Sequence, residues 1–195
     1  MPCWAIIPAK HPVGAKSRLA DALDEAARRR LAAAMLDHVL ATVAQAPGID
    51  RIAVVAPADL PLPPYVTRIA DPGTGLNPAI AAAFAQAAAA GATRVVVLHG
   101  DLPRLEPRDV ALLAGLPDAT MAIAPDRHDT GTNALSLPLD EAGGFTFAFG
   151  PGSFAAHERE SVKLRLDCEI IHTPGLARDI DEPADLRDAR GLDWD

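Results

Sequence analysis

The sequence predicts an α/β fold, in which a mainly parallel twisted sheet carries helices on both of its faces. Two observations lead to this expectation. Short apolar runs without an alternating polar face are typical of strands that are buried on both sides, and longer segments with helical periodicity separate these runs. Because strands and helices alternate along the chain, right-handed crossovers onto a parallel sheet are expected.

The strands are expected where the apolar runs are continuous. The four clearest runs are Trp4–Ala9, Arg51–Ala56, Arg94–Leu98 and Thr120–Ala124. Two later segments, Thr132–Leu137 and Cys168–His172, are also expected to be strands, around a loop rich in Gly and Phe. In open parallel sheets ligands bind beyond the carboxyl ends of the strands, so functional residues are sought in the loops that follow these runs.

Helices are expected between the strands. Apolar residues recur at three- and four-residue spacing from Ser17 to Gln45, and the segment from Asn77 to Ala90 is rich in alanine. Shorter helices are expected from Glu106 to Leu113, from Phe154 to Leu164 and after Pro183. The proline cluster from Pro57 to Pro64 is interpreted as a rigid surface connection rather than a domain linker.

Length and composition favour a single domain that spans residues 1–195. Of the 195 residues, 49% are apolar and 23% are charged, as in ordinary globular proteins. The formal net charge of −8 argues against non-specific binding to nucleic acid, and no stretch approaches the roughly 18 apolar residues of a membrane span. Cys3 and Cys168 match no metal-ligand spacing, and no basic leader precedes the first apolar run, so we expect a cytoplasmic protein.

Lysines cluster in the loop after the first predicted strand. Only three of the 18 basic residues are lysines, and two of these, Lys10 and Lys16, lie between Pro8 and Leu19. Lysine is a flexible point charge suited to polyphosphate, and free amide groups at a helix start would add to its attraction. The glycine spacing of a Walker loop is absent, which disfavours a P-loop nucleotidase. The alternative is a solvated basic loop in which Ser17 caps the following helix.

Three aspartates are candidates for holding a divalent cation. Asp101 follows the buried run Val95–Leu98, and an extended chain would direct the carboxylates of Asp179 and Asp181 to one face. Magnesium needs only one or two protein carboxylates when substrate phosphates complete its coordination. The alternative interpretations place Asp101 in a simple turn and make Asp181 the cap of the last helix.

Other polar turns could contact ligands. One glycine-rich turn contains Gly150 and Ser153, whose backbone amides and hydroxyl could cradle a carboxylate or phosphate, although Ser153 could equally cap a helix. Asn77 is expected either to cap the helix that it begins or to read a base edge. The most polar run, from Asp126 to Asn133, contains Thr132 and either meets an acid substrate or forms a solvated hairpin turn.

Taken together, these runs resemble the CofC family of MobA-like nucleotidyltransferases. The matching pieces occur in the family's order along nearly the whole chain: Pro8-Ala9-Lys10 with Ala15-Lys16-Ser17-Arg18-Leu19, Gly75-Leu76-Asn77, Gly100-Asp101-Leu102-Pro103, Asp126-Arg127 with Gly131-Thr132-Asn133-Ala134-Leu135, Phe149-Gly150-Pro151-Gly152-Ser153-Phe154 with His157, and Asp179-Ile180-Asp181 with Asp185-Leu186. The resemblance implies the Rossmann-like architecture of the nucleotide-diphospho-sugar transferases.

The resemblance also implies an activity, which is guanylyl transfer from GTP to a three-carbon phosphorylated acid in coenzyme F(420) biosynthesis, with release of pyrophosphate. The acid is 2-phospho-L-lactate, phosphoenolpyruvate or 3-phospho-D-glycerate, and the resemblance does not choose among them. The implied residues are Asp101, Asp179 and Asp181 for Mg2+, Thr132, Gly150 and Ser153 for the acid, and Lys10 and Lys16 for the triphosphate. Lys10, Lys16 and Asp101 are the expected catalytic residues, and Asn77 is an expected nucleotide contact.

Two other functions stay open at this point. One is MobA-like transfer to the molybdenum cofactor or to a sugar phosphate, which the missing early Gly-Gly loop disfavours. The other is a nucleotide-binding module without catalysis, which the retained carboxylates disfavour. The expected partners are GTP and a small phosphorylated acid, with no nucleic acid and no membrane. A homodimer is one assembly to consider, and the product is expected to pass to the next enzyme of the pathway.

Overall fold

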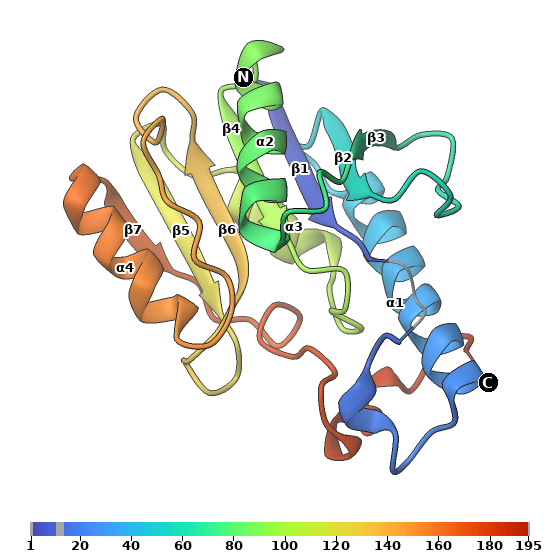
Figure 1. Ribbon diagram of the computed structural model, residues 1–195. Helices are drawn as coiled ribbons and strands as arrows, with labels where there is room; N and C mark the ends of the chain where they lie inside the picture. The colour runs from blue at the N-terminus through green and yellow to red at the C-terminus, as the bar shows by residue number, and fades with distance from the viewer. Residues whose placement is uncertain (1, 11–13, 195) are drawn as a thin grey trace.

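The computed structural model describes residues 2–10 and 14–194, which fold around one seven-stranded sheet (Figure 1). Across the sheet the strands follow the order β3-β2-β1-β4-β6-β5-β7. In chain order they are β1 (Cys3–Pro8), β2 (Arg51–Ala56), β3 (Thr67–Ala70), β4 (Arg94–Leu98), β5 (Thr120–Pro125), β6 (Thr132–Pro138) and β7 (Asp167–Ile170). The expected α/β class is confirmed.

Most neighbouring strands run parallel, as expected. β1 pairs in parallel with β2 and β4, β2 pairs with β3, and β5 pairs with β7. β6 runs antiparallel to both of its neighbours, β4 and β5. The polar run between β5 and β6 is therefore a hairpin turn, in which the Asp126 carboxylate accepts hydrogen bonds from the backbone amides of His128, Thr130 and Gly131.

Helices cover both faces of the sheet, as Figure 1 shows. They are α1 (Glu25–Gln45), α2 (Leu76–Ala89), α3 (Pro107–Ala114) and α4 (Ser153–Leu164), and two 3-10 segments are η1 (Ser17–Leu19) and η2 (Pro183–Ala189). α2 and α4 pack with the phenylalanine-rich segment on one face, whereas α1 and α3 form a second apolar cluster on the other. None of the described helices is long and apolar enough to cross a membrane.

The helix expected from Ser17 begins only at Glu25. Ser17 lies in η1, and the residue that caps α1 is Asp24, whose carboxylate accepts a hydrogen bond from the Ala27 amide at 2.7 Å. The expectation that Ser17 caps a helix is therefore wrong. The apolar spacing continues through residues 17–24, so it does not mark the true start of α1.

Two further elements differ from the expectation. The helix expected after Pro183 is the 3-10 segment η2, which a reciprocal capping box between Glu182 and Asp185 begins. The sequence pattern does not predict β3, because Ile69 is the buried residue among its four and no apolar run marks the strand. Asp181 lies outside η2 and does not cap it.

The carboxyl ends of β1 and β4 meet at the centre of the sheet. β2 lies on one side of β1 and β4 lies on the other, so the connections that leave β1 and β4 run toward opposite edges of the sheet. Open α/β sheets bind ligands at such a point. A third apolar cluster packs the segments around Leu19 and Ile180 against Leu31 and Met35 of α1. Figure 1 shows the resulting arrangement, with the first loop and the C-terminal segment side by side below the sheet.

Candidate functional site

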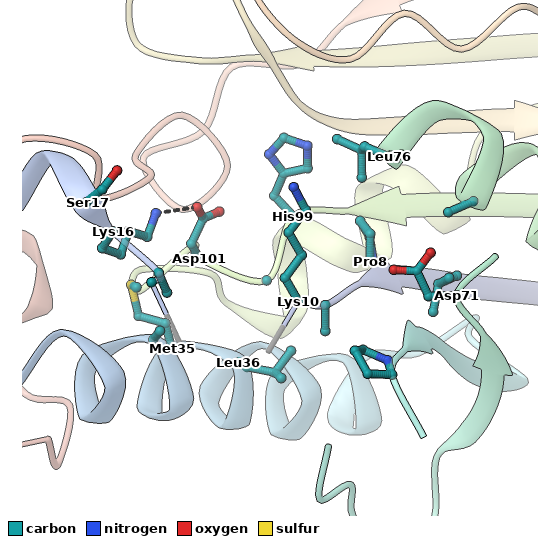
Figure 2. A pocket seen from close by; sticks show the side chains of 18 of the residues that line it. Pro8, Lys10, Lys16, Ser17, Met35, Leu36, Asp71, Leu76, His99 and Asp101 are labelled. Carbon is teal, nitrogen blue, oxygen red and sulfur yellow. Dashed lines mark hydrogen bonds and ion pairs between the residues drawn. The ribbon is translucent and has the colours of Figure 1, made fainter. Parts of the chain in front are cut away.

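A cleft of about 840 Å3 opens at the carboxyl ends of β1 and β4 (Figure 2). The loop after β1, the turn before α2 and the residues after β4 form its walls, and Met35 and Leu36 of α1 form part of its apolar side. The volume lies within the range of ligand-binding sites. The predicted functional residues that line it are Lys10, Lys16, Asp101 and Asp181.

The Lys16 ammonium lies between two carboxylates in this cleft. Its Nζ atom is 2.6 Å from Asp101 Oδ2 and 3.2 Å from Asp181 Oδ1, and 11% of the Lys16 side chain is exposed. Lys16 also has a left-handed backbone, with a φ of 53° that costs roughly 1–2 kcal/mol for a residue with a side chain. The two carboxylates therefore hold Lys16 in a conformation that its backbone does not favour.

These ion pairs set the charges in the cleft. Burial disfavours the ionised Asp101 carboxylate, but the charges of Lys16 and His99 and the hydrogen bonds of the carboxylate together outweigh burial, so the pKa of Asp101 lies below its ordinary value. Burial also disfavours the charged form of Lys16, and attraction to Asp101 and Asp181 outweighs it, which raises the pKa of Lys16. Lys16 and Asp101 are therefore both charged at neutral pH.

Asp179 lies near this cluster, close enough for the charges of Asp101 and Asp181 to affect its pKa. Burial, followed by the negative charges of Asp101 and Asp181, raises the pKa of Asp179. No Lys or Arg of the described chain forms an ion pair with Asp179. The second oxygen of Asp101, Oδ1, is buried and has no hydrogen-bond partner among the described residues. The cluster therefore has carboxylate oxygens that an additional cation could satisfy.

These oxygens have the chemistry that Mg2+ prefers in proteins. Among residues 2–10 and 14–194, no three acidic, His or Cys side chains are arranged to hold a metal ion together, and the Lys16 ammonium lies between Asp101 and Asp181. Asp101, Asp179 and Asp181 could hold a metal ion once the Lys16 side chain moves away.

Other cations extend along the loop after β1. Lys10 lines the cleft, and Figure 2 shows its side chain extending toward His99. Arg18 Nη1 pairs with Asp181 Oδ2 at 2.9 Å, at the exposed edge of the cleft. Residues 11–13 of the predicted basic loop lie outside the described residues. Lys10 and Lys16 therefore line the same cleft from one loop.

Asn77 has a structural role that the sequence does not reveal. The residue that precedes α2 as its cap is Gly75, so the expectation that Asn77 caps the helix is wrong. Its side-chain amide donates to Phe149 O at 3.1 Å, and its side-chain oxygen accepts from Phe149 N at 2.8 Å. Asn77 does not line the cleft; it fastens the phenylalanine-rich segment to α2, and its predicted contact with the nucleotide base has no support in this geometry.

The three predicted acid-binding residues lie together beside the cleft rather than in its lining. Thr132 is buried at the start of β6, Ser153 is buried at the first residue of α4, and Gly150 is exposed in the turn between them. The helix cap is Gly152, so Ser153 is not a cap, and no described group bonds to its hydroxyl. The turn reaches the β5–β6 hairpin, because the Phe154 amide donates to Thr130 O at 3.3 Å.

A partly buried ion pair positions the acidic C-terminal segment. Arg127 Nη1 is 2.6 Å from Asp185 Oδ1, while Asp185 Oδ2 accepts hydrogen bonds from the backbone amides of Asp181 and Glu182. The pair joins the segment that carries Asp179 and Asp181 to the β5–β6 hairpin. Arg127 and Asp185 both occur in the motifs described above, but nothing in their spacing indicates that they pair.

Two histidines near the cleft have no predicted role. His99 lines the cleft, its ring lies 5.2 Å from that of Phe149, and its buried Nε2 atom has no described hydrogen-bond partner. His157 is fully buried between Thr132 and the backbone of Ala148. Burial, and to a lesser extent the charge of His99, lower the pKa of His157 to about 4.

Comparison with known proteins gives a family for the whole chain. A family model described as "Guanylyl transferase CofC like" matches residues 3–189. The chain is 38% identical over 192 residues to a phosphoenolpyruvate guanylyltransferase from Sphaerobacter thermophilus, covering 96% of this chain and 92% of the relative. It is 39% identical over 206 residues to a phosphoenolpyruvate guanylyltransferase from Conexibacter woesei, covering 98% of this chain and 89% of that one.

The fold is also shared with a more distant enzyme structure. A nucleotidyl transferase from Methanothermobacter thermautotroptrophicus superposes with a TM-score of 0.68 over 97% of this chain and 96% of its own, at 14% identity. At that identity the likeness shows the fold alone. It agrees with the α/β architecture that the sequence predicts.

The low pKa of His157 predicts a pH-dependent loss of stability. Between about pH 6.5 and pH 4, His157 of the unfolded chain binds a proton that His157 of the folded chain does not. The contribution of neutral His157 to the free energy of unfolding is therefore fully present above pH 6.5, and the free energy of unfolding falls by up to roughly 3 kcal/mol as the pH approaches 4. Denaturant unfolding at each pH measures this change. Between pH 4 and pH 6.5, His157→Gln should flatten the dependence of the free energy of unfolding on pH, whereas replacement of an exposed histidine in His172→Gln should not. Equal pH dependence in the wild type and both variants would contradict the assignment of this effect to His157.

Proposed function

The chain belongs to the family of CofC-like guanylyl transferases and is a nucleotidyltransferase, and on this premise we propose that its cleft binds GTP for guanylyl transfer to a small phosphorylated acid. Pyrophosphate is the second product. The reaction belongs to coenzyme F(420) biosynthesis. We further propose phosphoenolpyruvate as the acid, because the relatives at 38% and 39% identity carry that name.

The observation that supports this proposal most is the convergence of Lys10, Lys16, Asp101 and Asp181 on one cleft. They come from the loop after β1, the end of β4 and the C-terminal segment. Asp179 lies close enough to Asp101 and Asp181 that their negative charges help to raise its pKa, after burial. A polyphosphate needs cations, and a divalent cation that accompanies it needs carboxylates. Both sets of groups lie at the position where open α/β sheets bind nucleotides.

We propose that Asp101, Asp179 and Asp181 hold Mg2+. The Oδ1 atom of Asp101 has no hydrogen-bond partner in residues 2–10 and 14–194, and the pKa of Asp179 is raised; both observations fit a site that gains a cation. When bound, Mg2+ would neutralise charge on the triphosphate and on the departing pyrophosphate. The Lys16 side chain would leave Asp101 as the cation arrives.

The protein's own groups bind and orient the two substrates. The phosphate of the acid is ionised near neutral pH, so one of its oxygens can attack the α-phosphorus of GTP. The bond between the α-phosphorus and the oxygen that bridges it to the β-phosphorus then breaks, and pyrophosphate leaves. No proton has to be removed by a protein base. Lys10 and Lys16 would hold the triphosphate in line with the acid, so catalysis depends mainly on positioning and on neutralisation of charge.

Compartment and assembly belong to the same proposal. Cys3 and Cys168 are both free thiols, which fits the reducing cytoplasm. Homodimerisation and transfer of the product to the following enzyme stay predictions.

A substrate panel tests the proposed reaction. The protein is incubated with Mg2+, one of the four nucleoside triphosphates and one of several acceptors: phosphoenolpyruvate, 2-phospho-L-lactate, 3-phospho-D-glycerate, a sugar phosphate or molybdopterin. Pyrophosphate release and mass spectrometry of the product, trapped by the next pathway enzyme if it is labile, should identify guanylyl phosphoenolpyruvate. Transfer only to molybdopterin or a sugar phosphate, or GTP binding without pyrophosphate release, would contradict the proposal.

Replacement of Asp101 tests the carboxylate site. Asp101→Asn keeps the size of the side chain and removes its charge, so turnover should fall by about 100-fold or more at saturating Mg2+ while the folded state persists. Exposed Asp140→Asn is the matched control and should keep wild-type turnover. Near-normal turnover of Asp101→Asn would exclude Asp101 from the catalytic site.

Replacement of Lys16 separates its two roles. Without the Lys16 ammonium, Asp101 loses its counter-ion and Asp181 keeps only Arg18, so Lys16→Met should bind Mn2+ about tenfold more tightly in the absence of nucleotide. The same variant should turn over more slowly with GTP. Mn2+ titration followed by electron paramagnetic resonance measures the affinity, and exposed Lys163→Met serves as the control. Unchanged Mn2+ affinity would mean that Lys16 does not compete with the metal ion.

A further inference from the structure

His157 makes one hydrogen bond through each ring nitrogen. The Ala148 amide donates to His157 Nε2 at 3.0 Å, and His157 Nδ1 lies 3.0 Å from Thr132 Oγ1. The ring is fully buried and packs between Phe145 and Phe149, at centroid distances of 5.7 Å and 4.9 Å. Its position and its plane are therefore fixed from several sides.

These contacts determine which nitrogen carries the proton. A backbone amide can only donate, so Nε2 is the acceptor and has no proton. Burial keeps the ring neutral, because the pKa of His157 is about 4. The single ring proton therefore resides on Nδ1 and is donated to Thr132 Oγ1.

The Thr132 hydroxyl is then left with a proton to donate. Its oxygen accepts from His157, and no other described group accepts a hydrogen bond from it. The side chain of the neighbouring Asn133 makes a different contact, because its amide nitrogen donates to Leu176 O at 2.9 Å. A buried hydroxyl donor without an acceptor is costly, so this arrangement fits a site that is completed by a ligand.

The segment around Thr132 contacts both a residue that lines the cleft and the helix that follows the glycine-rich turn. The His99 amide donates to Asn133 O at 3.0 Å, which places the start of β6 directly beside the end of β4. The Phe149 ring packs against both His99 and His157, and the Phe154 amide bonds to the hairpin at Thr130. Figure 1 shows the start of α4 and the β5–β6 hairpin at the same end of the sheet.

We propose that His157 is a positioning residue, which directs the Thr132 hydroxyl as a hydrogen-bond donor toward an anionic oxygen of the acid substrate. This inference rests on the proposed guanylyl transfer to a phosphorylated acid. His157 itself does not touch the substrate. If it only filled the core, its replacement would lower stability without selecting one substrate.

Two substitutions separate the functions of the two ring nitrogens. The side-chain amide nitrogen of His157→Asn can replace Nδ1 as a donor to Thr132, whereas the side-chain oxygen of His157→Gln can replace Nε2 as the acceptor from Ala148. His157→Gln and Thr132→Val should each raise the KM for the acid about tenfold and leave the KM for GTP unchanged. His157→Asn should stay near the wild-type KM for the acid, and the double variant Thr132→Val with His157→Gln should be no worse than either single variant.

The tautomer can be tested without any enzymatic activity. Long-range 15N–1H correlation spectra of the ligand-free protein should show His157 with its proton on Nδ1. A proton on Nε2 would overturn the inference. Equal increases in the KM for the acid in the Asn and Gln variants, or an equal increase in the KM for GTP, would reduce His157 to a structural residue.

The kinetic outcomes also separate this inference from the proposed function. Failure of the wild-type protein to transfer GMP to any of the acids would contradict the proposed function. Intact transfer with an unchanged KM for the acid in Thr132→Val and His157→Gln would contradict the positioning role alone.

Discussion

The Lys16 ammonium between Asp101 and Asp181 is the interaction on which the site depends. It joins Lys16, in the loop after β1, to Asp101 at the end of β4 and to Asp181 in the C-terminal segment. These aspartates lie 85 and 165 positions after Lys16 in the chain. Burial and then the charges of Asp101 and Asp181 raise the pKa of Asp179, so three carboxylates brought this close would repel one another without a cation. Lys16 supplies that cation in the ligand-free protein, at the cost of a left-handed backbone.

This arrangement connects folding with catalysis. The Arg127–Asp185 pair and the apolar cluster around Ile180 bring the C-terminal segment to the cleft, and Lys16 then fixes the carboxylates relative to the loop that carries it. In the proposed reaction, a substrate complex that brings its own cation and its own phosphates would offer Lys16 a new anionic partner and would give the carboxylates a new cationic one. The same groups would then stabilise the protein both without and with its substrates, and the proposed reaction would need no acid–base pair.

The sequence predicts best those parts that a local pattern determines. β2 and β4 begin and end where the apolar runs do, because buried strands leave a continuous apolar signal. β3 leaves no such signal at the edge of the sheet, and the start of α1 is hidden because apolar spacing continues through the segment before Asp24. Lys10, Lys16 and Asp101 can be chosen from residue type and position after a strand. Asp179 and Asp181 can be chosen from their i, i+2 spacing, and the structure brings Lys16, Asp101 and Asp181 into contact.

Roles that depend on long-range contacts could not be predicted. The sequence suggests Asn77 as a cap or a base contact, whereas the nitrogen and the oxygen of its side-chain amide both hydrogen-bond to the backbone of Phe149. Thr132 and Ser153 can be chosen as candidates from their motifs, but only the fold shows that His157 Nδ1 lies 3.0 Å from the Thr132 hydroxyl and that no described group bonds to the Ser153 hydroxyl.

The most direct test of the account is a crystal structure of the protein with Mg2+ and a GTP analogue whose α,β-bridge is a methylene group. The account predicts that Lys16 Nζ contacts a phosphate oxygen and that Mg2+ is bound by Asp101 together with Asp179, Asp181 or both. A bound nucleotide with Lys16 still lying between Asp101 and Asp181, and no metal ion on these carboxylates, would contradict it.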